Sequence, residues 1–370
     1  MRIVGFGTYD TTKHPRVGVL LEGLAAAGDE VIEVNAPLRL STADRVAMLQ
    51  RPWRLWRLVA LLAQLWWQLL QGARAARRAG PIDAVLVGYL GHFDVLLARC
   101  CFPRTTIVLD QMIFAADTAQ DRGVSSGAKL SLLRGLDWLA TAAATVVVVD
   151  TAEHLELCSK RARPRAIVVP VGAPEAWRAA RPETPPGTGG GPLRVIFYGL
   201  FTPLQGATTL GEALGLLRDR EDIVATLVGS GQDAPAALAA ARANPRVTEV
   251  AWVDADELPA LVAEHDVCLG IFGTTDKAQR VVPNKVYQGA ALGRCLVTSS
   301  TAPQRQAFDG AACFVAPGSP AELADALVQL ATDRARVEAL GLAAAQRSDH
   351  AFSSSAIVAQ LRAELQRNGR

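Results

Sequence analysis

Three cations stand close together in the second half of the chain. Lys277 and Arg280 lie in a polar loop between two apolar runs, and Lys285 follows shortly after Pro283. Proline suits the start of a helix, because the N–H that it lacks would have no partner there and its φ is already helical. Free N–H groups at a helix start attract anions, and nearby cations add full positive charge. This spacing predicts a site for an anion such as a diphosphate; a loop of solvated surface cations is the alternative.

Two glycine-containing loops follow predicted strands in the same half of the chain, in the segments GLFTPLQG and GSG. Glycine lets a backbone come close to a phosphate or lie flat against a ring, and N–H groups at a helix start again favour an anion. Either loop alone is more often a simple turn. Together with the loop that holds Lys277 and Arg280, they make three loops that follow three strand ends, and this arrangement favours a nucleoside diphosphate as the ligand. The residues expected to contact it here are Gly199, Thr202, Gln205, Gly206, Gly229 and Gly231.

The first half supplies candidates at the ends of its own predicted strands. The run IVGFG ends at Gly7 and leads through a polar loop to Arg16 and an apolar-periodic helix, the opening of a Rossmann-like unit. There is no GxGxxG motif, so nothing here indicates a dinucleotide. His92 and Asp110 each follow a predicted strand, where open α/β sheets bind ligands. The alternatives are a helix N-terminal partner for His92 and a helix cap for Asp110.

The elements that must position these residues alternate between apolar runs and helix-periodic segments. The alternation runs twice along the chain and predicts an α/β protein with two Rossmann-like domains facing each other across a cleft. The segment 178–192, RAARPETPPGTGGGP, has the proline and glycine content that is typical of a linker. The predicted domains are residues 1–177 and 193–350, followed by a helix over 351–370.

The predicted strands are short apolar runs, and the predicted helices repeat apolar residues at steps of three and four. In the first half we expect strands at 3–7, 30–34, 83–87, 105–109 and 145–149. In the second half we expect strands at 194–198, 223–228, 247–253, 267–272, 295–299 and 312–315, with helices at 208–218, 235–242, 258–264 and 321–331.

The composition of the 370 residues is that of globular domains, with half of them apolar and a formal net charge of +2. This charge gives no support to nucleic-acid binding. The six cysteines include no CxxC pair and no histidine at metal-ligand spacing, so we expect no bound metal and reduced thiols in a cytoplasmic protein. The N-terminus resembles a first strand rather than a signal peptide, and no apolar run is long enough to span a membrane.

Residues 51–78 have the most unusual composition. Arginines and glutamines recur at steps of three, four or seven on one arc of a predicted helix, and tryptophan, leucine and alanine fill most of the rest. Such a helix could lie in a membrane interface, with the protein peripheral on the inner face of the membrane. The alternative is that its wide apolar face packs on the sheet, as long helices do in α/β domains.

Three segments carry a family resemblance: GTYDTTKHPR near the start, FYGLFTPLQG after the predicted linker, and LGIFGTTDKAQRVVPNKVYQGAALG. They resemble the retaining nucleotide-sugar glycosyltransferases of the GT-B fold, in particular the bacterial members of glycosyltransferase family 4. The resemblance covers nearly the whole chain and is more specific in the second half. It implies transfer of a sugar from a nucleoside diphosphate sugar, with a UDP-sugar favoured, to an acceptor hydroxyl with retention at the anomeric carbon. It implies no metal and no further cofactor.

The resemblance also implies roles for single residues. Asp110 falls where many relatives place a His or Asp against the sugar, and His92 is a second catalytic candidate in that domain. Lys277 and Arg280 fall in the diphosphate loop, and we take them as catalytic through their charge. The implied donor-binding residues are Gly7, Arg16, Gly199, Gly206, Asn284, Lys285 and Gln288.

Two positions depart from the family pattern. Gln205 stands where relatives commonly have a basic residue, and Gln288 stands where they have a glutamate that binds the donor ribose. A neutral amide still accepts a hydrogen bond, but one to a charged group is stronger by about 1 kcal/mol. The departures leave open a catalytically weak or inactive nucleotide-sugar-binding partner protein. The acceptor is open as well, between a lipid-linked cell-envelope molecule and a small secondary metabolite.

Overall fold

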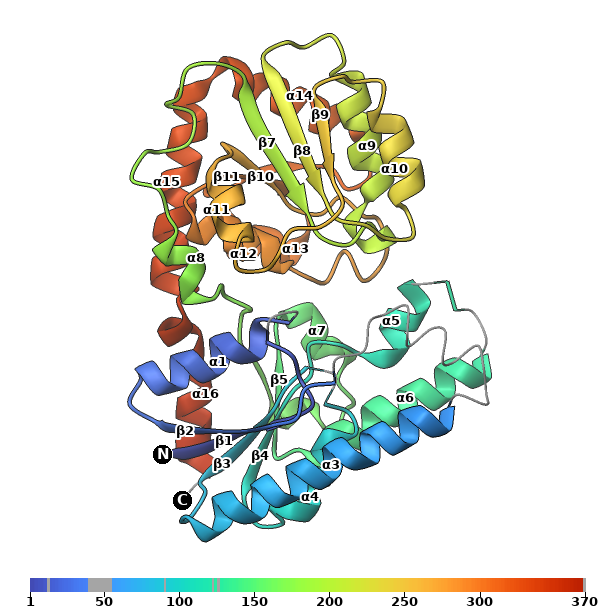
Figure 1. The fold of residues 1–370 in the computed structure, drawn as a ribbon, viewed down its shortest axis with the longest axis vertical. Helices are drawn as coiled ribbons and strands as arrows, with labels where there is room; N and C mark the ends of the chain where they lie inside the picture. Colours follow the sequence, from blue (N-terminus) through green and yellow to red (C-terminus); the bar gives the residue numbers. More distant parts are fainter. Residues whose placement is uncertain (12–13, 39–54, 90, 122, 125–126, 369–370) are drawn as a thin grey trace.

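The protein consists of two α/β domains, each built on a parallel sheet between helices. The computed structural model in Figure 1 describes residues 1–11, 14–38, 55–89, 91–121, 123–124 and 127–368. Loops that follow strands of one sheet contact loops that follow strands of the other, so the carboxyl ends of the two sheets face each other. The prediction of an α/β fold with two Rossmann-like domains is confirmed.

The first sheet has the strand order β2-β1-β3-β4-β5-β6, with every pair parallel. Its buried strands are apolar runs, as is usual when helices cover both faces of a sheet. The edge strand β6 was not predicted, because three half-buried residues are too short a run to show a period. The strands are β1 (Arg2–Gly7), β2 (Glu30–Asn35), β3 (Ala84–Val87), β4 (Thr106–Asp110), β5 (Val146–Val149) and β6 (Ala166–Val168).

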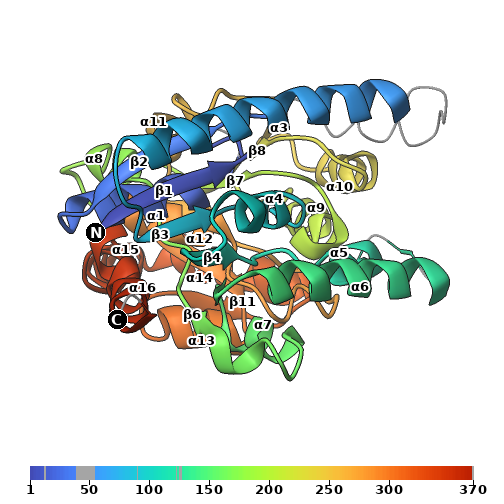
Figure 2. The same cartoon turned by 90° about the horizontal axis from the view of Figure 1, so that it is seen from below.

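Helices cover both faces of this sheet. One face carries α1 and the C-terminal helix α16, and the other carries α3, α4 and α6 side by side (Figures 1 and 2). Two short helices follow β4 and β5 on the side of the second domain. The helices of this domain are α1 (Arg16–Ala26), α3 (Leu55–Arg78), α4 (Asp94–Cys101), α5 (Ala115–Asp121), α6 (Gly127–Ala143) and α7 (Ala152–Leu157). The next helix, α8 (Glu175–Ala179), packs in the core of the second domain through Trp177.

The second sheet has the order β12-β11-β10-β7-β8-β9 and is also parallel throughout. Every strand predicted for this half is present, but β9 and β10 are shorter than predicted. The apolar run that starts at Val267 stays buried to Phe272, but only its first part pairs in the sheet, because burial and strand pairing are separate properties. The strands are β7 (Leu193–Tyr198), β8 (Ile223–Val228), β9 (Val247–Val250), β10 (Val267–Leu269), β11 (Cys295–Ser299) and β12 (Cys313–Val315).

The helices predicted at 208–218, 235–242, 258–264 and 321–331 are present, with ends within two residues of those predicted, whereas the helices Ala302–Phe308 and Arg334–Ala351 were not predicted. The described residues also include 3₁₀ turns at Arg163–Arg165 and Pro203–Gln205. The helices are α9 (Ala207–Leu216), α10 (Ala234–Ala241), α11 (Leu258–Ala263), α12 (Asn284–Ala291), α13 (Ala302–Phe308), α14 (Pro320–Thr332), α15 (Arg334–Ala351) and α16 (Ser354–Asn368).

The chain first crosses between the domains just after β6. Val169 packs in the core of the first domain and Val171 in that of the second, so the crossing falls at Pro170. The chain returns just before α16, because Phe352 belongs to the core of the second domain and Ile357 to that of the first.

These two crossings lie side by side. A Cβ atom on Gly172 would lie 3.0 Å from the carbonyl oxygen of Phe352, and the φ of this glycine is +70°. Glycine is favoured there because a side chain would be strained and would meet the returning chain. The two crossings together form the hinge between the domains.

The predicted linker 178–192 is not the hinge but part of the second domain. Arg181 binds Asp349 of α15 at 2.7 Å, and the Gly187 N–H donates to Asp266 at 2.8 Å. Proline and glycine content reports the absence of regular structure and says nothing about which domain a segment packs on. The predicted boundary is therefore displaced along the chain.

Helix α3 packs one apolar face on the first sheet, as the core-packing alternative expected. Leu65, Leu69, Ala73 and Ala76 are buried against β-strand side chains, and Trp66 donates to Asp94 of α4 at 3.1 Å. Residues 51–54 of the predicted helix lie outside the described residues. Among the described helices, none has the length and apolar content needed to cross a membrane.

Candidate functional site

Lys285 marks the centre of the candidate site, in the first turn of α12 beside the end of β7. Its ammonium lies 3.5 Å from the centroid of the Phe197 ring and donates to Gln205 Oε1 at 2.7 Å. The residue is only 5% exposed, and this burial lowers the pKa of the lysine to about 7. Removal from water disfavours the charged form, so an anion placed against the ammonium would be bound strongly.

Gly199 ends β7 directly beside this ammonium. Its φ is +130°, and a Cβ atom there would lie 3.4 Å from Lys285 Nζ. A side chain at this position would therefore be strained and would crowd the space next to the lysine tip. The loop predicted to face a phosphate thus leaves room beside the buried ammonium of Lys285.

The other predicted glycines hold neighbouring loops in close contact. A Cβ on Gly206 would lie 2.3 Å from the backbone of Phe272, and a Cβ on Gly229 would lie 2.0 Å from the carbonyl oxygen of Gly199. Gly231 approaches the backbone of Phe201 in the same way. The loops after β7, β8 and β10 are therefore one packed unit at the carboxyl edge of the second sheet. A glycine pair after a strand is explained here by loop packing, whether or not it also contacts a ligand.

Gln288 lies one turn further along α12 and is nearly buried. Its Oε1 accepts from the Tyr198 hydroxyl at 3.0 Å, and burial raises the pKa of that tyrosine well above its usual value, so it remains a donor. Asn284, the first residue of α12, is half-buried, and Thr202 begins the 3₁₀ turn before Gly206 without capping it. The predicted donor residues of this domain therefore gather around Lys285, but the Gln288 oxygen already has a partner within the protein.

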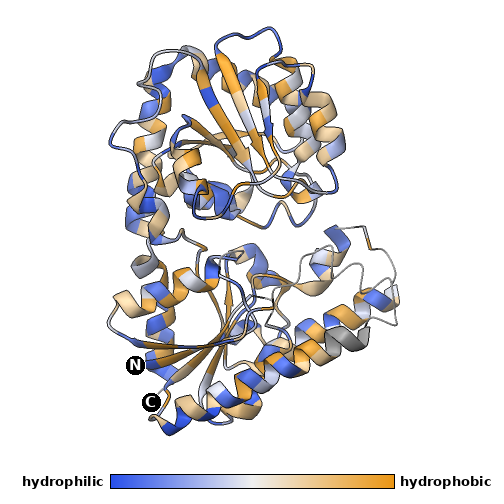
Figure 3. Cartoon of the chain, viewed as in Figure 1, coloured by the Kyte–Doolittle hydropathy of each residue, from blue (hydrophilic) through white to orange (hydrophobic). Residues whose placement is uncertain are grey.

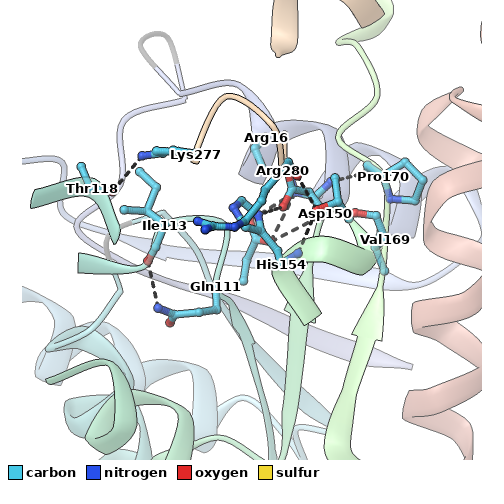
Figure 4. A network of polar contacts seen from close by, with 12 residues as sticks. Arg16, Gln111, Ile113, Thr118, Asp150, His154, Val169, Pro170, Lys277 and Arg280 are labelled. Carbon is cyan, nitrogen blue, oxygen red and sulfur yellow. Dashed lines mark hydrogen bonds and ion pairs between the residues drawn. The ribbon is translucent and has the colours of Figure 1, made fainter. Parts of the chain in front are cut away.

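Lys277 and Arg280 do not point at the same space as Lys285. Both reach the first domain: Lys277 Nζ donates to Thr118 Oγ1 at 2.8 Å, and the Arg280 guanidinium pairs with Asp117 (Figure 4). In this arrangement a carboxylate from α5 already pairs with the arginine and a threonine hydroxyl accepts from the lysine, so the diphosphate role of these two residues stays a prediction.

Two further bonds join the same loop to the first domain. Thr275 donates to Asp121 at 2.6 Å, and Thr151 donates to the Arg280 carbonyl oxygen at 2.7 Å. We call the contact of Thr275, Lys277 and Arg280 with α5 the α5 contact. It was not predicted, although Asp117 and Asp121 are four residues apart and so share one face of a helix. The spacing shows the face but not the partner.

Replacing Asp117 by asparagine is expected to weaken the α5 contact by about 1 kcal/mol, since an ion pair with both side chains partly exposed contributes about that much. Amide hydrogen exchange over residues 273–282 should become about fivefold faster. Asp276→Asn is the matched control: Asp276 also lies near Arg280, at 3.6 Å, but comes from the same loop with its side chain 92% exposed. Equal acceleration in both variants would show that the contact does not hold the domains together.

Arg16 and Asp110 form a buried ion pair at the hinge. The guanidinium lies 3.3 Å from the carboxylate and also donates to the carbonyl oxygens of Val169 and Pro170, where the chain leaves the first domain. Burial raises the pKa of Asp110, and Arg16 opposes that rise. Both side chains are closed off from solvent, so the structure does not support a sugar-facing role for Asp110 or a donor-binding role for Arg16.

His92 is also occupied within the first domain. Its Nε2 lies 2.8 Å from Asp137 of α6 and 3.1 Å from Gln111 Nε2, and the residue is buried. Gly7, with a φ of +148°, leaves room for the Asp94 carboxylate, which accepts from the Thr8 backbone and hydroxyl. The structure therefore gives His92 and Gly7 positions that explain them without a ligand.

A second buried pair went unpredicted at the end of β5. His154 bonds Asp150 through Nδ1, one helical turn apart, and both lie near Arg280 in the close-up view (Figure 4). Thr151, which lies between them in the sequence, caps the following helix by accepting from the His154 N–H. Within the described part of the chain, no group of three His, Cys, Asp or Glu side chains is placed to hold a metal ion.

Most of the second domain matches the model of a known family. Residues 192–333 match the model of the family described as "Glycosyl transferases group 1". No curated protein sequence matches the chain significantly.

Solved structures similar to the whole chain share its two-domain fold. One is sucrose-phosphate synthase from Thermosynechococcus elongatus, with a TM-score of 0.67 and 14% identity over 99% of this chain and 98% of that one. Another is HepE of Anabaena in complex with UDP and glucose, with a TM-score of 0.67 and 12% identity over 99% and 100%. A glycosyltransferase from Rickettsia africae has a TM-score of 0.63 and 11% identity over 99% and 98%. The GT-B prediction is confirmed.

Proposed function

We propose, from the match of residues 192–333 to the model of glycosyl transferases group 1 and from the GT-B fold, that the protein is a retaining glycosyltransferase. It moves a sugar from a nucleoside diphosphate sugar to an acceptor hydroxyl. The observation that carries the proposal is the Lys285 ammonium, nearly buried between Gly199 and Gln205 at the start of α12. A helix start, a cation and free backbone groups in one place suit a diphosphate.

A UDP-sugar is the favoured donor. The structures of HepE contain UDP, UDP and glucose, or UDP-glucose, and this chain resembles each of them over 99% of its length. The loops after β7, β8 and β10 offer the nucleotide a continuous packed surface. No metal enters the proposal, since the cation and the helix start can offset the charge of the diphosphate.

The chemistry needs no nucleophile from the protein. As the bond between the anomeric carbon and the phosphate oxygen breaks, negative charge grows on the diphosphate, and Lys285 stabilises it electrostatically. The acceptor hydroxyl attacks from the same face of the sugar and passes its proton to the departing phosphate oxygen. Closure of the domains through the α5 contact would hold the acceptor against the donor and exclude water.

The acceptor is an alcohol, either lipid-linked or a small soluble molecule. The Lys285 site lies at the carboxyl edge of the second sheet, which faces the first domain, so an acceptor bound to the first domain would face the donor. We place the protein in the cytoplasm, peripheral on the inner face of the membrane for a lipid-linked acceptor.

A second candidate is a nucleotide-sugar-binding partner protein without turnover. It is favoured by the neutral Gln205 beside Lys285 and by Gln288, whose oxygen is held by Tyr198. These residues leave the donor with fewer charged contacts than the family pattern implies.

Calorimetry with UDP and an assay of UDP-glucose turnover distinguish the glycosyltransferase from the nucleotide-sugar-binding partner protein. The enzyme hypothesis expects UDP binding together with UDP release from UDP-glucose, or from another UDP-sugar, in the presence of a panel of alcohols. Binding without release across the panel would favour the partner protein. If UDP does not bind, uracil is excluded as the base of the donor. If no nucleoside diphosphate binds, both hypotheses are contradicted.

A further inference from the structure

One face of the first domain has a surface that its own fold does not explain. Helices α3, α4 and α6 form a single layer over the sheet (Figure 2). Arg77 of α3 donates to the Cys101 carbonyl oxygen of α4, and Arg99 of α4 donates to the Ala143 carbonyl oxygen of α6. The three helices are thus joined side by side, and their outer faces make one continuous surface.

The outer face of α6 is apolar although it faces solvent. Leu132 is 75% exposed and Leu139 43%, and they stand seven residues apart with Gly135 between them. Ala128 and Ala142 are also exposed and extend the same stripe. The inner face of α6 is separately buried on the sheet, so this helix carries apolar residues on two opposite sides. Figure 3 shows that apolar residues recur along α6.

Exposed aromatic side chains continue this stripe across the layer. Trp67 is 58% exposed, next to Trp66, which bonds Asp94 of α4. Phe93 is 53% exposed, between His92 and Asp94. His92 bonds Asp137 of α6, and the next residue of that helix, Trp138, is 49% exposed. Five of the nine exposed large apolar side chains described belong to these three helices and the start of α4, which marks the layer as a binding surface.

The charge of the layer is one-sided. The acidic residues of α3, α4 and α6 are Asp94 and Asp137, and both are buried and hydrogen-bonded. The exposed charged side chains described on these helices are all basic: Arg74, Arg77, Arg78, Lys129 and Arg134. Such a surface attracts an anionic partner and repels a second copy of itself.

We infer that the layer of α3, α4 and α6 binds the surface of an anionic lipid bilayer, with its exposed leucine and aromatic side chains in the headgroup region and its basic side chains on the lipid phosphates. Exposed apolar and aromatic groups with flanking cations and no exposed acid suit that interface. The earlier expectation for residues 51–78 thus changes: most of the apolar face of α3 is used on the sheet, and α6 supplies the larger exposed stripe. This inference does not depend on the proposed sugar transfer.

The test is co-sedimentation with vesicles of phosphatidylcholine alone and of phosphatidylcholine mixed with phosphatidylglycerol. We expect binding to the mixed vesicles at low salt, little binding to phosphatidylcholine, and release by added salt. The double variant Leu132→Asp with Leu139→Asp should partition into mixed vesicles about tenfold less, because it loses apolar contact and adds negative charge.

The matched control is Leu216→Asp with Leu342→Asp, two leucines of the second domain that are 61% and 58% exposed. It should bind vesicles as the unchanged protein does. Circular dichroism melting and calorimetry with UDP show whether each variant is folded and keeps its nucleotide site. The inference is overturned if the unchanged protein stays in the supernatant at low salt or if both double variants lose binding equally. Light scattering that shows a dimer dissociated by the α6 variant would assign the surface to a second copy instead.

Discussion

Replacing Lys285 by methionine is expected to weaken the binding of UDP about thirtyfold, or about 2 kcal/mol, because it removes the buried charge that faces the space beside Gly199. Methionine fills a similar volume, and it also removes an ammonium that is costly to bury. The variant should therefore fold at least as well as the unchanged protein. Calorimetry with UDP gives the affinity, and melting curves give the stability.

The same lysine predicts how affinity depends on pH. Its pKa of about 7 means that the free protein carries the charge below that pH and loses it above. Affinity for UDP-glucose, whose phosphates stay ionised, should be flat below about pH 7 and fall by up to about tenfold per unit above it, because binding then requires uptake of a proton. Lys285→Met should flatten this profile.

Lys277→Met is the matched control for Lys285→Met, because it removes a lysine charge from the loop that precedes α12. The Lys277 ammonium already bonds Thr118 of the first domain, so we expect a loss in UDP affinity of about threefold at most. A larger loss for Lys277→Met than for Lys285→Met would restore the sequence-based assignment of the diphosphate to the loop before α12. A pH profile that stays flat in the unchanged protein would remove Lys285 from the site.

Replacing Asp110 by alanine is expected to lower the free energy of unfolding of the first domain by about 3 to 5 kcal/mol. The change leaves the Arg16 guanidinium fully buried beside two carbonyl oxygens without its counter-charge. Hydrogen exchange of the β4 and β5 amides measures the effect within that domain.

A paired substitution separates structure from catalysis at this position. Replacing Arg16 by methionine together with Asp110 by leucine should recover most of the lost stability, since apolar pairs often replace buried ion pairs without loss. A catalytic Asp110 would instead give full stability in the alanine variant and little turnover. That outcome would contradict the hinge role and support the sugar-facing one.

The repeating strands could be predicted because buried parallel strands are continuous apolar runs. The segment VVVV of β5 shows this plainly, and the β11 run CLVTS was placed at its true ends. The hinge could not be predicted in the same way. It is formed by ordinary residues around Pro170, whereas the proline- and glycine-rich segment 178–192 lies against α15.

For the candidate site, too, local features could be predicted from the sequence and contacts between distant residues could not. Lys285 was predicted because a cation just after Pro283 marks a helix start, and that feature is local in sequence. Arg16 and Asp110 were placed correctly at strand and loop ends, but they are 94 residues apart and satisfy each other. Arg280 was expected to be available to a ligand and is held by Asp117, 163 residues away. Sequence order shows which loop a side chain occupies, but a distant partner decides whether it is free.

The position of the hinge gives the α5 contact mechanical leverage. Both chain crossings lie at one edge of the molecule, and α5 lies toward the opposite edge (Figure 1). Two adjacent crossings permit the domains to swing about one axis, so displacement grows with distance from that axis. A small rotation at Gly172 would open the largest gap at α5. The weak bonds of the α5 contact lie far from the rotation axis, so each of them opposes rotation of the domains with a larger torque than a bond of equal strength near the hinge. The same bonds are stretched most by a given rotation, so they break first when the domains separate.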